Sequence, residues 1–174
     1  MEQEIREIFE RITERFEIPI RLSHRCETGV YYHVEDLSSP ELELCAQFIA
    51  ERVRNVAHPL LPSILINLPG GYTDLAATLS TELAPPGESL EIITMKDLDA
   101  GNGHLARLKN ARCILVNDVI TTARSCLAIH SRITMLGASV LCWACLVDRT
   151  FGPGPVPVVA AYTGAPVTLL GEIP

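Results

Sequence analysis

An acid, two threonines and a serine follow a short aliphatic segment in the second half of the chain. The segment Cys113–Asn117 is typical of a buried strand, and Asp118 comes directly after it. Thr121, Thr122 and Ser125 come next, at the predicted start of a helix. The first N–H groups of a helix lack partners within the helix, and its dipole places about half a positive charge there. With short hydroxyl side chains beside them, such N–H groups form a cradle for phosphate.

This arrangement favours a phosphorylated pentose as the ligand. The phosphate would occupy the start of the helix, and the carboxylate of Asp118 would lie near the sugar hydroxyls. A capped turn explains the same residues equally well, because Asp118 and the threonines can satisfy backbone groups on their own. The pattern by itself leaves both interpretations open.

Strands and helices are predicted to alternate around this segment. Apolar runs bounded by Pro, Gly or polar residues predict strands at Ser63–Leu68, Leu90–Thr94, Cys113–Asn117 and Ser139–Val147. Apolar spacing and helix-start residues predict helices at Glu2–Phe16, from Ser38 to about Val53, from Asp74 to about Leu83, and at Ser125–Leu136. The proline-rich tail has room only for short strands. This order predicts an α/β fold with a mainly parallel sheet covered on both faces.

Ligands of such sheets bind at the carboxyl ends of the strands. The predicted loops at these ends are Pro69–Tyr72, Lys96–Lys109 and Asp118–Ser125. The first is expected to be a tight turn, and it lacks the GxGxxG order of a dinucleotide-binding site. The second has no clear periodicity and contains Gly101 and Gly103, so we expect a long mobile loop.

Composition narrows the class of protein. The 174 residues suit one compact domain, residues 1–174, and a hydrophobic content of 48% is enough to bury a core. A net charge of −7 argues against a basic face for nucleic acid or anionic membrane. Apolar stretches are too short to cross a bilayer, and the N-terminus lacks the order of a signal peptide. We therefore expect a cytoplasmic protein without nucleic-acid or membrane partners.

The chain has six cysteines, and Cys142 and Cys145 have the CxxC spacing of redox and zinc sites. Both fall on the predicted strand Ser139–Val147, where residues three apart point to opposite faces. A second CxxC pair or a histidine cluster that would complete a zinc site is missing from the sequence. We therefore expect no metal site built from the side chains of this protein alone.

The segment Asn117–Ser125 resembles the ribose-phosphate motif of the type I phosphoribosyltransferases. In that motif a strand leads to two acids, Val-Ile-Thr-Thr, two glycines and Ser or Thr. Tyr31–Leu44 and Val147–Arg149 resemble the orotate phosphoribosyltransferases of the same family, and the likeness extends over roughly residues 25–150. The resemblance implies a mainly parallel central sheet flanked by helices, with a small hood made of N-terminal and C-terminal segments.

The resemblance also implies a reaction. The protein would bind phosphoribosyl pyrophosphate (PRPP) with Mg²⁺ and transfer its ribose 5-phosphate group to a pyrimidine such as orotate, as a homodimer. Asp118 and Lys96 would be catalytic, and Arg149 would bind the base. The residues implied to bind PRPP are Asn117, Asp118, Thr121, Thr122, Ala123, Arg124, Ser125, Gly70 and Gly71.

The sequence departs from the family pattern at this site. Asn117 replaces the first acid and loses its negative charge, and Ala123 and Arg124 replace the two glycines. The glycine turn at 70–71 has no Lys or Arg beside it, and Lys96 stands where the family has several lysines. These departures give a second hypothesis, a non-catalytic regulatory protein that binds PRPP or a nucleotide on the same fold.

Overall fold

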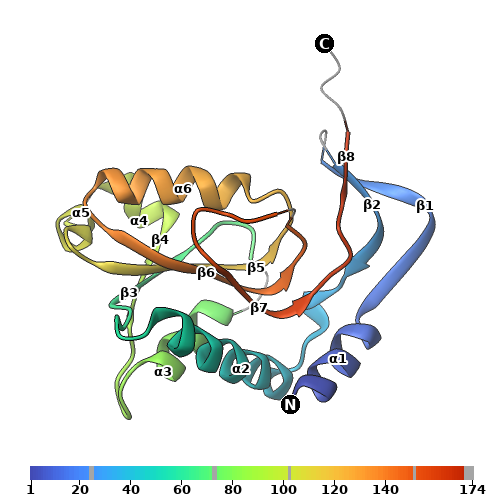
Figure 1. Cartoon of the computed structure of the whole chain (residues 1–174), viewed down its shortest axis with the longest axis horizontal. Helices are drawn as coiled ribbons and strands as arrows, with labels where there is room; N and C mark the ends of the chain where they lie inside the picture. Colours follow the sequence, from blue (N-terminus) through green and yellow to red (C-terminus); the bar gives the residue numbers. More distant parts are fainter. Residues whose placement is uncertain (24–25, 72–73, 102, 151, 171–174) are drawn as a thin grey trace.

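The computed structural model describes residues 1–23, 26–71, 74–101, 103–150 and 152–170. A five-stranded parallel sheet forms its centre, and a three-stranded antiparallel sheet stands beside it (Figure 1). The predicted α/β class with a mainly parallel sheet is confirmed. The strand order of the parallel sheet is β4 (Glu91–Thr94), β3 (Ile64–Asn67), β5 (Arg112–Ile120), β6 (Ser139–Asp148) and β7 (Val158–Thr163).

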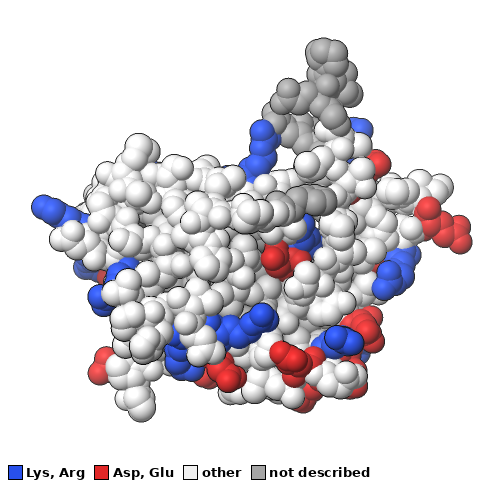
Figure 2. All heavy atoms as spheres, viewed as in Figure 1, with Lys and Arg blue, Asp and Glu red and all other residues white. Residues whose placement is uncertain are grey.

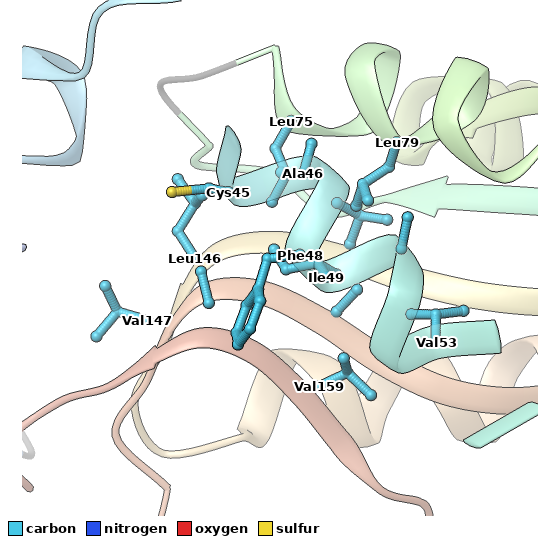
Figure 3. Packing of buried hydrophobic residues seen from close by; sticks show 14 of the residues in the cluster. Cys45, Ala46, Phe48, Ile49, Val53, Leu75, Leu79, Leu146, Val147 and Val159 are labelled. Carbon is cyan, nitrogen blue, oxygen red and sulfur yellow. The ribbon is translucent and has the colours of Figure 1, made fainter. Parts of the chain in front are cut away.

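Two apolar cores lie on the two faces of the parallel sheet. One face is covered by α1 (Glu2–Arg11), α2 (Ser39–Ala57) and α3 (Leu75–Leu83), and the other by α4 (Met95–Ala100), α5 (His104–Leu108) and α6 (Arg124–Met135). Figure 3 shows Phe48 and Ile49 of α2 directed at the strands that carry Leu146 and Val159. Because both faces are covered, the strands are hydrophobic runs without alternation.

The cysteines of β6 belong to different cores. Cys142 packs on the α2 side of the sheet and Cys145 on the α6 side, so their predicted placement on opposite faces is confirmed. All six cysteines are buried, and each is a thiol outside any disulfide bond. Burial raises the pKa of Cys142 to about 12 and raises that of Cys145 as well. These thiols are packing groups of the core.

The antiparallel sheet combines the two ends of the chain, as predicted for the hood. Its strands are β1 (Thr13–Ser23), β2 (Cys26–Tyr32) and β8 (Thr168–Leu169), in that order. The short 3-10 helix η1 (Val34–Asp36) leads from β2 toward α2. We call this three-stranded sheet the hood.

The first helix is shorter than predicted. Apolar spacing predicts a helix through Phe16, but α1 ends at Arg11. From Thr13 onward the backbone pairs antiparallel with β2, with Thr13 opposite Tyr32. The pairing strand follows only two residues after β1, so the two strands form a hairpin in place of the predicted end of the helix.

The prediction of a long loop at Lys96–Lys109 is wrong, because most of this segment forms α4 and α5. The hydroxyl of Thr94 accepts a hydrogen bond from the N–H of Asp97 (3.3 Å), and the Asp97 carboxylate accepts one from the N–H of Thr94 (2.8 Å). This reciprocal cap stabilises the start of α4. Leu98 and Leu108 are buried in the core on this side of the sheet.

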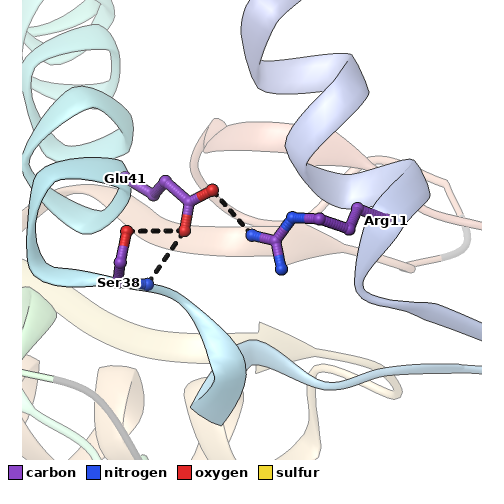
Figure 4. A network of polar contacts seen from close by, with 3 residues as sticks. All are labelled: Arg11, Ser38 and Glu41. Atoms are coloured by element: carbon purple, nitrogen blue, oxygen red, sulfur yellow. Dashed lines mark hydrogen bonds and ion pairs between the residues drawn. The ribbon is translucent and has the colours of Figure 1, made fainter.

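The start of α2 depends on one carboxylate. Glu41 accepts hydrogen bonds from the N–H and the hydroxyl of Ser38 (2.9 and 2.7 Å), and it pairs with Arg11 of α1 (2.6 Å; Figure 4). The hydrogen bond from the Ser38 hydroxyl is the main cause of a lowered pKa of Glu41. This carboxylate both closes the first turn of α2 and attaches α1 to it.

Acidic and basic side chains are interspersed on the face shown in Figure 2, and the described residues of that face form no broad basic patch. Within the described ranges, the helices are either too short or too polar to cross a membrane.

We expect Glu41→Gln to lower the free energy of unfolding by about 1 kcal/mol near neutral pH, the usual effect of losing a helix cap. The folded pKa of Glu41 lies below its ordinary value of 4.5, so its contribution is complete above that value and is lost as the pH falls through the folded pKa. Urea unfolding of both proteins across pH should show the difference shrinking in acid. Glu43→Gln, on the exposed face of the same helix, should change little. A difference that is constant with pH would contradict this account.

Candidate functional site

Strand β5 carries the predicted acid to the carboxyl edge of the parallel sheet. It continues past the predicted end at Asn117, because Val119 and Ile120 extend the pairing with β6. The N–H of Asp118 donates to the side-chain oxygen of Asn117 (2.9 Å). A Cβ placed on Gly71 would lie 3.5 Å from both carboxylate oxygens of Asp118. The turn after β3 and the acid on β5 are therefore in close contact.

A cavity of about 540 Å³ opens between this edge and the hood, a volume within the usual range of small-molecule sites. Asp118 is only 4% exposed, yet it lines this cavity and belongs to neither apolar core. The hood and η1 contribute Leu22, Cys26, Tyr31, Tyr32 and Val34, and the sheet edge contributes Pro69, Gly70, Asn117, Asp118, Val119, Thr121, Thr122, Arg124, Ser125 and Arg149.

The start of α6 has the features that phosphate binding requires. Thr121 and Thr122 occupy the bend after β5 and line the cavity. α6 then begins at Arg124 without a side-chain cap, so its first N–H groups are not taken by a capping side chain. Arg124 and Ser125 are exposed and line the cavity, and Arg124 forms no ion pair with the described residues.

Arg149 is a buried cation in the same cavity, only 3% exposed. Its backbone N–H donates to the carbonyl of Ile120 (2.8 Å), which places it beside the end of β5. Its Nε donates to the Ala165 carbonyl (2.6 Å) and its Nη2 to the Thr28 hydroxyl (2.5 Å). The guanidinium lies 5.3 Å from the centre of the Tyr32 ring, and burial lowers the pKa of Arg149.

The guanidinium of Arg149 contacts the neutral groups of Ala165, Thr28 and Tyr32, and no carboxylate among the described residues pairs with it. A buried charge is costly unless an opposite charge reaches it. Together with Arg124 at the start of α6, Arg149 makes the cavity suited to a ligand that carries two anionic groups.

Solved structures resemble this chain over most of its length, although no protein-family model and no curated protein matches it. An orotate phosphoribosyltransferase from Aeropyrum pernix aligns with a TM-score of 0.63 and 20% identity, over 91% of this chain and 93% of its own. The chain has the type I phosphoribosyltransferase fold. A hypoxanthine phosphoribosyltransferase from Trypanosoma cruzi complexed with IMP aligns at 0.53 and 14%, over 72% and 73%. A hypothetical protein from Neisseria gonorrhoeae with bound ppGpp aligns at 0.56 and 14%, over 74% and 82%.

Most of the predicted site residues line one cavity of this phosphoribosyltransferase fold, and the exceptions are Lys96, Ala123 and Gly71. Lys96 is exposed on α4 and does not line the cavity. Ala123 borders a second cavity of about 280 Å³ on the other side of the bend after β5. Gly71 touches Asp118 rather than the cavity itself, and Tyr72, which was expected to complete that turn, lies outside the described residues.

The hood supplies site residues that the sequence pattern did not single out. Tyr31 and Tyr32 line the cavity, and Thr28 binds Arg149. Both tyrosines lie in Tyr31–Leu44, the segment that resembles orotate phosphoribosyltransferases, so this resemblance was the signal in the sequence that pointed to them. Thr28 had no such signal, because its role depends on how β2 lies against the end of β6.

Ala123 has a φ of +57°, the left-handed region that glycine prefers, and it stands where the family motif has glycine. We expect Ala123→Gly to raise the free energy of unfolding by roughly 0.5–1 kcal/mol, because the relief of strain exceeds the entropy of the added glycine. Ala128→Gly, inside α6, should instead lower it by about 1 kcal/mol. Urea unfolding measures both. Equal losses in the two variants would mean that position 123 does not require positive φ.

Proposed function

We propose that this protein transfers the ribose 5-phosphate group of PRPP to a pyrimidine base such as orotate. The observation that carries the proposal is the buried Arg149, which pairs with no carboxylate of the described residues and shares one cavity with the uncapped start of α6. A nucleotide of a carboxylated pyrimidine has a phosphate and a carboxylate, which match these two cationic regions. The fold shared with orotate phosphoribosyltransferases supports the same activity.

The 5-phosphate would bind at the start of α6. The hydroxyls of Thr121, Thr122 and Ser125 and the first N–H groups of the helix would donate to its oxygens. The N–H of Ala123 belongs to the same turn. Arg124 is exposed and has no partner among the described residues, so its guanidinium is available to pair with a phosphate oxygen.

The ribose would lie over Asp118 and Asn117. As the bond between C1 and pyrophosphate lengthens, positive charge develops on the sugar ring, as in glycoside cleavage. The Asp118 carboxylate would accept hydrogen bonds from the ribose hydroxyls and stabilise this charge. A ring nitrogen of the base would then attack C1 from the opposite face. The pyrophosphate would leave along the turn that contains Gly70 and Gly71.

Mg²⁺ is part of the proposal, and the residues of the cavity would bind it only together with the phosphates of the substrate. Within the described residues, no three His, Cys, Asp or Glu side chains are grouped to hold a metal. Mg²⁺ commonly binds through one or two carboxylates and the phosphates of a substrate. Asp118 would be the carboxylate, and the bound ion would neutralise charge on the departing pyrophosphate. Lys96 is the proposed further cation for the leaving group, acting across the interface of the expected homodimer.

The base would bind against Arg149. A carboxylate such as that of orotate would pair with the guanidinium, and the Tyr31 and Tyr32 side chains would border the pyrimidine. Carboxylate recognition thus distinguishes orotate from uracil, which lacks this group.

Binding without catalysis is the second candidate function, and two observations favour it. Lys96 lies outside the cavity, and Asn117 supplies no charge to the ribose. The Neisseria gonorrhoeae structure with bound ppGpp is a protein of this fold that holds a nucleotide. A sensor of PRPP or of a nucleotide would use the same phosphate contacts at α6.

Purified protein with PRPP, Mg²⁺ and orotate should release pyrophosphate, measured by a coupled assay. Asp118→Asn should lower kcat about a hundredfold or more, because it removes the charge that stabilises the transition state. Asp99→Asn, exposed on α4 and outside the cavity, is the matched control and should retain activity. Calorimetric binding of PRPP without pyrophosphate release with any common base would exclude the transferase and favour the sensor.

Arg149→Lys should raise KM for orotate at least about tenfold, since an ammonium group cannot reproduce the planar fork of the guanidinium. The preference for orotate over uracil should fall with it. Arg52→Lys is a close control: Arg52 also donates to a backbone carbonyl, that of Ala160 (3.2 Å), and lies 5.3 Å from an aromatic ring, but it is outside the cavity. An unchanged preference in Arg149→Lys would remove this residue from base recognition.

A further inference from the structure

The guanidinium of Arg149 is fixed at two points that belong to different parts of the chain. Its Nε donates to the carbonyl of Ala165, in the segment between β7 and β8. Its Nη2 donates to the hydroxyl of Thr28, on strand β2 of the hood. A guanidinium has five N–H donors, and these two bonds leave the others for a ligand.

The hydroxyl of Thr28 has no freedom to reorient. Thr28 is 3% exposed, and its Oγ1 donates to the carbonyl of Val30 (2.9 Å) and accepts from the N–H of Val30 (3.0 Å). Its single proton is therefore engaged, and Oγ1 meets the guanidinium of Arg149 only as an acceptor. A fixed acceptor holds the plane of the guanidinium in one orientation.

A neutral anchor has a second effect on Arg149. An Asp or Glu in place of Thr28 would form an ion pair and cancel the positive charge inside the cavity. The threonine holds the guanidinium without neutralising it, so the charge stays available to an anion. Tyr32, under the same guanidinium, is neutral as well.

We propose that Thr28 is a positioning residue that orients Arg149 toward the anionic group of the base. The inference rests on the proposed function for the identity of that base. The anchoring of Arg149 itself does not depend on any substrate, so it can be tested separately.

The first test measures the guanidinium directly. In ¹H–¹⁵N spectra of the whole protein, the Nε–Hε signal that disappears in Arg149→Lys identifies Arg149. Thr28→Val should increase the rate of guanidinium rotation and of Nε hydrogen exchange about tenfold or more, and Thr28→Ser should leave both near wild type. Thr13→Val, which removes another hydroxyl of the hood that binds a backbone carbonyl, is the matched control. Equal rates in Thr28→Val and wild type would overturn the proposal, and Thr28→Ala provides the same comparison if the valine variant does not fold.

The second test separates positioning from general loss of structure. Thr28→Val should raise KM for orotate about tenfold with kcat changed less than about twofold, and Thr28→Ser should restore KM. In the Arg149→Lys background the same change should have little further effect. An equal rise of KM in both backgrounds would show that Thr28 does not act through Arg149. Failure of the wild type to use orotate would count against the proposed function, while the rotation rates would still decide the role of Thr28.

Discussion

The pairing of β5 with β6 is the constraint on which the site depends. After a register shift between Cys113 and Ile114, the two strands stay in register from Ile114 to Ile120, and the backbone N–H of Arg149 then bonds to the carbonyl of Ile120. This ladder fixes Asp118 on one strand and Arg149 at the end of the other. The helices on both faces bury the ladder from water, so two groups far apart in sequence keep a constant relation.

The charge of the cavity differs from the charge of the whole chain. The protein carries a net charge of −7, which argues against long polyanions as partners but says little about a small anion. Arg124 and Arg149 both line the cavity, and neither pairs with a described carboxylate. Under the proposed function, these local cations and the amides of α6 would receive the phosphate, because fields at such short range depend on a few groups.

The parallel sheet was predictable from sequence, and the hood was predictable only through resemblance. Runs such as Ser63–Leu68 and Ser139–Val147 are apolar on both faces, and this pattern is specific for covered parallel strands. The start of the strand after α1 was missed because Ile12 and Phe16 continue the helical spacing of apolar residues in α1. The helix at Met95–Ala100 was missed because a Thr–Asp cap, Thr94 with Asp97, is a weaker sequence signal than Ser or Thr with Glu.

One part of the candidate site was likewise predictable from the sequence, and another part was not. Asp118, Thr121 and Thr122 form one continuous segment, so their type and spacing were visible in the sequence. The burial of Arg149 against neutral groups was not visible, because it results from contacts with Thr28 and Ala165 that only the folded chain brings together. The exposure of Lys96 likewise depends on the packing of α4.

The walls of the cavity come from two different sheets. The hood presents side chains of β1 and β2, whereas the opposite wall consists largely of the ends of β3 and β5 and the start of α6. Substitutions on β2 can therefore reshape one wall while the backbone of the other stays in place. Under the proposed function, natural selection acting on the hood would change which base is accepted and leave the phosphate contacts at the start of α6 intact.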